Sequence, residues 1–161
     1  MNRPDRATRL GLEPHPEGGW FRRTWTSPLT VDLPRGRRAA ASLIHYLLSD
    51  GEASAWHIVH SDEVWLWHGP GRLTLQFGGD AAAPEPGETA VLGGDAASDQ
   101  SVQVLVPAGI WQRTLPAEGE VLVSCLVSPE FSYDDWALDD TVEAANGSHD
   151  VTDSAPKPER S

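Results

Sequence analysis

The sequence contains a single cysteine, Cys125, so no disulfide can form within the chain. It also lacks any apolar run close to the roughly 20 residues that a membrane-spanning helix requires. The N-terminal residues MNRPDRATRLGLEP do not include the apolar segment of a secretory signal. From these absences we expect a cytoplasmic protein that has no membrane partner.

Basic residues are scarce beyond the first quarter of the chain. The formal net charge is −12, and eight of the twelve Lys and Arg residues lie in residues 1–38. Nucleic-acid binding requires a basic surface, so we expect no nucleic-acid partner. The N-terminal arginines either pack against an acidic body, in the same or a neighbouring subunit, or serve solubility alone.

The chain does contain a series of short β-strand patterns, which are separated by turns rich in Gly and Pro. A spacing of roughly 8–12 residues between such strands is typical of a sandwich or a barrel. The predicted strands cover residues 20–26, 40–48, 55–60, 63–68, 72–77, 88–92, 101–106, 111–115 and 120–127. Residues 69–71, Gly-Pro-Gly, predict a break between two of these strands.

The two ends of the chain differ from its middle. Short helical segments are predicted at residues 3–10 and from Ser132 onward. Residues 139–161 are acidic and contain no Leu, Ile, Met or aromatic residue. This composition predicts a disordered tail that follows a single domain of residues 1–138.

The residues most capable of chemistry are concentrated in residues 54–70, SAWHIVHSDEVWLWHGP. Side chains two apart in a strand share a face, so His57 and His60 lie on opposite faces. If the chain turns after His60, an inward His57 can approach an inward Glu63. Such a pair can either ligate a divalent metal or position a proton carrier.

Further candidates surround this pair. Trp65 shares the strand face of Glu63, while Trp111 and Gln112 follow the Pro-Ala-Gly turn at residues 107–109. Aromatic side chains that line a concave pocket suit a small organic ligand, although the same tryptophans can instead fill the barrel core. His45 lies in an apolar strand and belongs either to the site or to the core.

Four stretches resemble, in this order, the cupin_5 (DUF985) family of the cupin superfamily: LGLEPHPEGGWFRRTW, SAWHIVHSDEVWLWHG, VPAGIWQ and VSCLVSPEFSYDDWAL. The resemblance spans residues 10–138. It implies an all-β fold, a double-stranded β-helix (cupin jelly-roll) barrel with short N- and C-terminal helical segments, and a homodimer. The family also tends to carry Glu17 and Arg22. Arg22 is able to receive an anionic ligand, unless both residues merely fix the N-terminal segment to the barrel.

The metal-binding motifs of cupins are only half matched. The first motif, H-x-H-x(3,4)-E-x(6)-G, falls on His57, Val59 and Glu63, and the second, P-x-G-x(2)-H, ends on Gln112. Two of the four usual ligands are therefore replaced. A divalent metal bound through His57, Glu63 and Gln112 would be held weakly.

Three functions fit these observations. We favour an isomerase, an epimerase or a related lyase that acts on a small polar metabolite, sugar-like or a carboxylate. In this hypothesis His57 is the general base, Glu63 orients it, and Gln112 or Arg22 holds a substrate oxygen. The alternatives are a non-catalytic module that binds a metabolite and a metal-dependent cupin enzyme.

Overall fold

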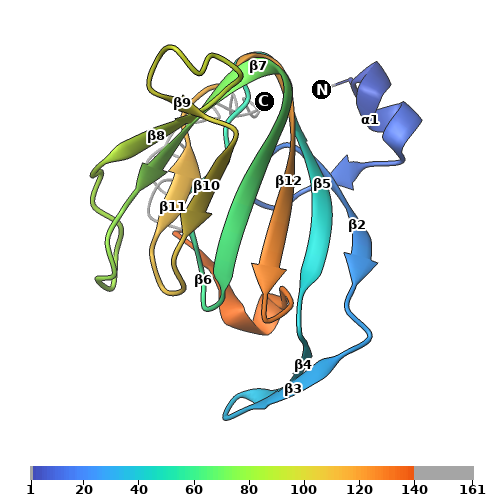
Figure 1. The fold of residues 1–161 in the computed structure, drawn as a ribbon, viewed down its shortest axis with the longest axis vertical. Coiled ribbons are helices and arrows are strands. Elements are labelled where there is room, and N and C mark those ends of the chain that lie inside the picture. Colours follow the sequence, from blue (N-terminus) through green and yellow to red (C-terminus); the bar gives the residue numbers. More distant parts are fainter. Residues whose placement is uncertain (1, 140–161) are drawn as a thin grey trace, which may run out of the picture.

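The structure is a computed structural model that describes residues 2–139, so the predicted tail lies outside the described residues except for Asp139. Strands dominate, and they curl into a half-barrel (Figure 1). The strands are β1 (Glu13–Pro14), β2 (Trp20–Thr26), β3 (Thr30–Leu33), β4 (Gly36–Ala39), β5 (Ser42–Leu48), β6 (His57–Val59), β7 (Asp62–Phe77), β8 (Thr89–Leu92), β9 (Gln100–Ser101), β10 (Gln103–Val106), β11 (Gln112–Thr114), β12 (Glu118–Ser128) and β13 (Trp136–Leu138). The helical segments are α1 (Asp5–Leu10) and the 3-10 turn η1 (Tyr133–Asp135).

The main sheet has the strand order β1-β2-β5-β12-β7-β11-β6-β13, with β10 and β8 also paired to β7. The first half of β7 pairs with β12 and β10, and its second half pairs with β8 and β11. Thus one long strand joins the two halves of the curled sheet. The predicted all-β jelly-roll fold with short helical ends is confirmed.

Alternation along the strands divides the sheet into an inner and an outer face. The inner face carries the main core, in which Tyr46, Trp65, Val123 and Cys125 are almost fully buried. On the outer face, α1 covers Leu47 together with Leu12 and Trp20. No helix in the described part of the chain is long and apolar enough to cross a membrane.

The predicted break at residues 69–71 is wrong, because β7 runs through it. Gly69 has a φ of 88°, a left-handed conformation that glycine adopts without steric cost. The strand can therefore bend and remain in the sheet, with β12 pairing on both sides of the bend. Outside the main sheet, β3 and β4 form a separate two-stranded hairpin.

Candidate functional site

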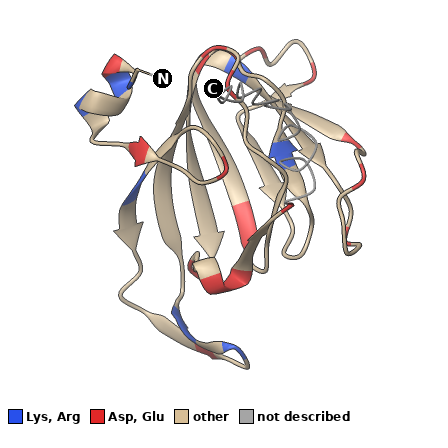
Figure 2. Cartoon of the chain, turned by 180° about the vertical axis from the view of Figure 1, so that it is seen from behind, with Lys and Arg blue, Asp and Glu red and all other residues tan. Residues whose placement is uncertain are grey.

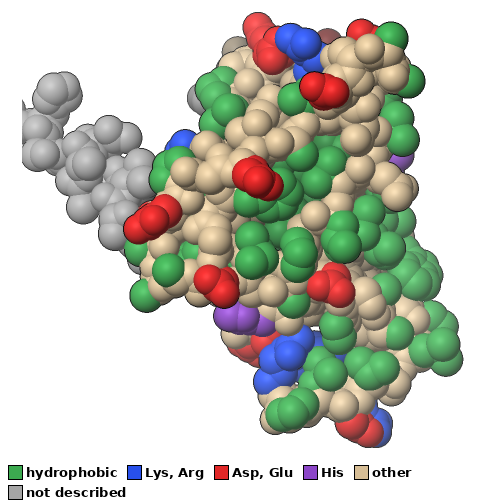
Figure 3. Space-filling view, turned by 60° about the vertical axis from the view of Figure 1, so that its left-hand side comes forward, with side chains coloured by type: hydrophobic (Ala, Val, Ile, Leu, Met, Phe, Trp, Pro, Cys, Tyr) green, Lys and Arg blue, Asp and Glu red, His purple; other side chains and the backbone are tan. Residues whose placement is uncertain are grey.

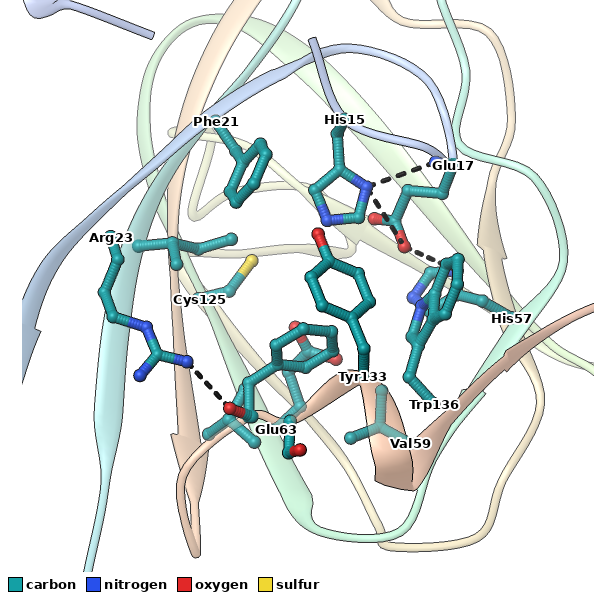
Figure 4. Close-up of a pocket in the computed structure, with 14 residues that line it drawn as sticks. His15, Glu17, Phe21, Arg23, His57, Val59, Glu63, Cys125, Tyr133 and Trp136 are labelled. Atoms are coloured by element: carbon teal, nitrogen blue, oxygen red, sulfur yellow. Dashed lines mark hydrogen bonds and ion pairs between the residues drawn. The ribbon is translucent and has the colours of Figure 1, made fainter. Parts of the chain in front are cut away.

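A cavity of about 290 Å³ opens at the end of the half-barrel near His57 (Figure 4). Strands β2, β5, β6, β7 and β12 contribute to its wall, together with the loop before β2 and the segment after β12. It is lined by His15, Glu17, Phe21, Arg23, Ile44, His57, Val59, Glu63, Cys125, Val127, Phe131, Ser132, Tyr133 and Trp136. Of the predicted site residues, it therefore unites His57, Glu63 and Glu17.

The loop of residues 15–19 brings Glu17 to the cavity. Its own backbone closes it, because the amide of Gly18 donates to the carbonyl of His15 at 3.0 Å. The loop is fixed to the barrel by the Tyr46 hydroxyl, which donates to the Gly18 carbonyl at 2.7 Å. Gly18 has a φ of 105°, and a Cβ there would lie 2.5 Å from the carbonyl oxygen of Ala53. Only glycine allows this approach, so the Gly18-Gly19 pair sets the position of Glu17.

His57 is buried beside Glu17. Its Nδ1 lies 2.9 Å from the carbonyl oxygen of Ala55 and 3.3 Å from Oε2 of Glu17. A carbonyl oxygen can only accept, so Nδ1 carries the proton and Nε2 is the basic nitrogen of the neutral ring. The carboxyl group in contact with His57 is therefore Glu17, while Glu63 acts on the ring through its charge.

Glu63 is held by a separate chain of hydrogen bonds. The indole of Trp65 donates to Oε1 of Gln112 at 2.9 Å, and Nε2 of Gln112 donates to Oε2 of Glu63 at 2.6 Å. Since the indole can only donate, this network fixes the orientation of the Gln112 amide. All three side chains are buried, so Glu63 has a fixed position in the cavity wall.

Burial governs the protonation of these groups. Loss of hydration raises the pKa of Glu17 to about 8 and that of Glu63 to about 7. The same effect lowers the pKa of His57 and lowers that of His15 to about 4. Near neutral pH the cavity thus holds neutral imidazoles beside carboxyl groups that are poised to exchange protons.

The segment of residues 130–136, here called the cap, covers the other side of the cavity. Arg23 donates to Oε2 of Glu130 at 2.9 Å and to the Phe131 carbonyl at 2.7 Å. At the far end of the cap, Nε of Arg35 donates to the buried Asp135 at 2.9 Å. Figure 2 shows this acidic segment beside the basic β3–β4 hairpin. Ion pairs therefore hold the cap in place.

Several predicted site residues lie outside the cavity lining. Arg22 is on the outer face of β2, paired in register with His45, because Phe21 and Arg23 take the inward positions. Arg22, expected to receive an anionic ligand, therefore does not line this cavity. Trp65 supports Gln112 from the core, and Trp111 packs with Trp56 away from the cavity.

The sequence interpretation missed the contributions of His15, Arg23, Tyr133 and Trp136 to the cavity. The cap was predicted only as a short helical segment from Ser132 onward. Alternation along β2 places Arg23 on the same face as Phe21 and Arg22 on the opposite face. This alternation was the sequence signal that could have identified Arg23 as a lining residue.

The residues present do not fit the metal that cupin motifs imply. Val59 offers no donor atom, and Gln112 uses its carbonyl oxygen on Trp65 and its amide nitrogen on Glu63. In the described part of the chain, no three His, Cys, Asp or Glu side chains are arranged to hold a metal ion. Gln112 therefore acts on Glu63 and is not free as an oxygen ligand.

Comparison with known proteins identifies the family. The model of the cupin superfamily (DUF985) matches residues 5–139. The chain belongs to this family. The resemblance predicted from the four sequence stretches is confirmed, and the match includes the cavity, its loop and its cap. A comparison with curated proteins found no match.

Solved structures agree with this assignment. A protein from Shewanella oneidensis is 36% identical, with a TM-score of 0.76, over 90% of this chain and 88% of that one. A hypothetical protein from Leishmania major is 28% identical, with a TM-score of 0.75, over 87% of this chain and 88% of that one. Oxalate decarboxylase from Bacillus subtilis shares the fold at 15% identity and a TM-score of 0.54, over 83% of this chain and 33% of that one.

Proposed function

We propose that this cupin is an acid–base enzyme that moves a proton at a carbon atom of a small metabolite, as an isomerase, epimerase or lyase does. The observation that carries the proposal is the pairing of a neutral His57 with Glu17 at 3.3 Å in the same cavity as a second carboxyl group, Glu63. Proton transfer to and from carbon requires a base and an acid that reach one substrate.

His57 is the general base in this proposal. Its Nε2 takes a proton from carbon, and the electron pair of the broken C–H bond remains on the substrate. The positive charge that forms on the imidazolium favours the ionised form of the neighbouring Glu17 carboxyl group, whose pKa burial otherwise raises to about 8.

Glu63 is the general acid. Burial raises its pKa to about 7, so a substantial fraction carries a proton near neutral pH. It donates this proton either to a second position on the substrate, as in an isomerase, or to a leaving group, as in a lyase. Gln112 keeps the carboxyl group in place during both steps.

Exchange of substrate hydrogen for solvent deuterium tests this proposal. Metabolites with an acidic C–H bond are incubated in deuterium oxide and analysed by mass. We expect exchange with wild type and a loss of about 10²-fold or more in His57→Gln. The matched control is His60→Gln, because His60 is exposed, lies beyond the end of β6 and does not line the cavity. Exchange that is unchanged in His57→Gln would reject the proposal.

The alternative is a module that binds a metabolite without turnover, and the replacement of two metal-ligand positions by Val59 and Gln112 favours it. A ligand at about 100 times its Kd stabilises the fold by about 2.7 kcal/mol. A thermal shift of that size without any change in the ligand would support this alternative.

The predicted cytoplasmic location and the single domain of residues 1–138 remain predictions.

We also propose a homodimer that forms through the outer face of the sheet. Five apolar side chains are in register across neighbouring strands: Trp25, Leu43, Leu126, Val64 and Leu105. Trp25 and Leu105 are 45% and 54% exposed, and Figure 3 shows how widely hydrophobic side chains spread over the surface. Monomers rarely expose a contiguous apolar patch, and a sheet face that pairs with its own copy gives the commonest symmetry, a two-fold dimer.

A further inference from the structure

A continuous series of aromatic rings lines the cavity. Measured between ring centroids, Phe21 lies 4.4 Å from His15, and His15 lies 6.4 Å from Trp136. The series continues from Trp136 to Tyr133 at 5.4 Å and from Tyr133 to Phe131 at 5.0 Å. Every successive pair is close to perpendicular, at 74°, 76°, 87° and 82°. Successive rings therefore meet edge to face along the lining of the cavity, where Figure 4 labels Phe21, His15, Trp136 and Tyr133.

Such an arrangement has a chemical preference. The face of an aromatic ring carries negative potential, so a group of rings at right angles attracts a positive charge placed between them. Methylated ammonium groups suit this environment because they are weakly hydrated and apolar at their surface. Aromatic cages of this kind recognise quaternary ammonium ligands.

The charged groups of the cavity lining also favour a cationic ligand. Arg23 is the only Lys or Arg in the lining, and its guanidinium is already paired with Glu130 and the Phe131 carbonyl. Burial raises the pKa of Glu17 to about 8 and that of Glu63 to about 7, so a cation placed beside these carboxyl groups favours their ionised forms. Among the described residues, the lining thus offers carboxyl groups that a bound cation can ionise and no uncommitted Lys or Arg for an anion.

We infer that the cavity takes a small organic cation, such as a methylated amine, with its charged head among the aromatic rings and near the carboxyl groups of Glu17 and Glu63. The cavity of about 290 Å³ limits the ligand to a small molecule. The inference rests on the proposed function in that it names the substrate class of the same cavity. A cationic ligand takes the place of the carboxylate metabolite expected from sequence, because Arg22, the residue expected to receive an anion, does not line the cavity.

Three unreactive probes of matched shape test the inference by calorimetry. Choline carries a trimethylammonium group, 3,3-dimethylbutan-1-ol is its neutral carbon isostere, and 3,3-dimethylbutanoate is an anion with the same bulky end. We expect choline to bind at least about tenfold more tightly than the alcohol, and the anion to bind most weakly. Equal or tighter binding of the alcohol or the anion would overturn the inference, as would the absence of choline binding at millimolar concentration.

Substitutions in the cavity lining test where choline binds. Tyr133 is 51% exposed, so its replacement should leave the fold intact. Tyr133→Leu removes a ring and is expected to weaken choline binding about fivefold, while Tyr133→Phe keeps the ring and should stay within about twofold of wild type. Glu63→Gln should weaken choline about tenfold and leave the alcohol within about twofold. Choline binding that is unaffected by both Tyr133→Leu and Glu63→Gln would place the cation elsewhere and overturn the inference.

This equilibrium measurement is independent of turnover. If choline binds as expected and no metabolite exchanges deuterium, the acid–base proposal fails while the ligand class stands. If exchange occurs with a neutral or anionic metabolite and choline does not bind, the ligand class fails while the acid–base proposal stands.

Discussion

The side chain of Gln112 connects the barrel core to the site. Only 1% of it is exposed, and both ends of its amide are used, one by Trp65 and the other by Glu63. A histidine at this position would serve a metal in the usual cupin motif. In this chain the amide instead fixes a carboxyl group and supplies it with one hydrogen bond.

Replacing Gln112 should therefore destabilise the fold. Gln112→Ala leaves the Trp65 indole and the Glu63 carboxyl group buried without their partner, and we expect the free energy of unfolding to fall by about 2–4 kcal/mol. Chemical denaturation measures this change. Gln76→Ala is the matched control, because Gln76 is only half-buried and accepts from Arg113, and its cost should stay below about 1 kcal/mol. Equal costs for the two variants would contradict the role given to Gln112.

The buried ionisable residues predict how stability depends on pH. Glu17 and Glu63, with pKa values raised to about 8 and about 7, hold protons in the folded state at a pH where the unfolded chain has released them. Their contribution is therefore lost as the pH rises. His15 and His57 have lowered pKa values, so they destabilise the fold as the pH falls below that of an unfolded histidine.

Stability should consequently fall by about 1–2 kcal/mol between about pH 6.5 and 8, where the carboxyl groups dominate. Urea denaturation across this range measures the effect. In Glu17→Gln, which cannot ionise, most of the fall should disappear. A stability that rises over this range in wild type would show that these carboxyl groups are ionised in the folded state.

At the residue scale, the sequence predicted part of the site. The spacing of His57 and Glu63 placed both inside the barrel, because strand parity is a local property. The contact between His57 and Glu17 joins a strand to a loop forty residues away in the chain, and no local pattern encodes it. The choice between Arg22 and Arg23 depended on which face of β2 turns inward, and both faces carry aromatic residues.

At the scale of elements, the cap depends on a few ion pairs. Asp135 is buried and pairs with Arg35 at 2.9 Å and with Arg38 at 3.6 Å. Asp134, its neighbour, is 88% exposed and forms a longer ion pair of 4.0 Å with Arg38. Two adjacent aspartates therefore differ in burial and in partners, which provides an internal control.

We expect Asp135→Ala to cost about 2–4 kcal/mol, because it leaves arginine groups without their buried partner. Asp134→Ala should change stability by no more than about 0.5 kcal/mol. Thermal denaturation of the two variants, with hydrogen exchange of the cap amides, measures the difference. If both variants matched wild type, the cap would not depend on Asp135.

The elements were predicted with uneven success. β2 has the predicted bounds, since its β-branched and aromatic residues lie between clear turn signals. β7 was predicted as two strands, because Gly and Pro normally end a strand. Pairing with β12 on both sides keeps β7 continuous, and this long-range interaction is absent from the local sequence.

At the scale of the whole molecule, the four family stretches were sufficient to predict the fold, while composition alone pointed only to a sandwich or a barrel. The distribution of apolar side chains on the outer face was not predicted. It depends on the register of five strands that are far apart in the sequence, from Trp25 on β2 to Leu105 on β10.

A charged substitution in the apolar row tests the proposed dimer. Leu105→Glu places a carboxylate in the apolar row, and we expect it to convert a dimer into a monomer at micromolar concentration, because an unpaired buried charge is costly. Sedimentation velocity measures the mass. Leu29→Glu is the control, since Leu29 is 71% exposed and outside the row. A wild-type chain that sediments as a monomer would refute the dimer.

The state of the His57 ring tests the central claim most directly. Nitrogen NMR of the labelled protein at neutral pH distinguishes Nδ1 from Nε2 by their chemical shifts, and the spectrum of His57→Gln assigns the signals. The structure predicts a neutral ring with its proton on Nδ1 and a free electron pair on Nε2. A permanently charged ring, or a proton on Nε2 with Nδ1 bare, would contradict the assignment of His57 as the base.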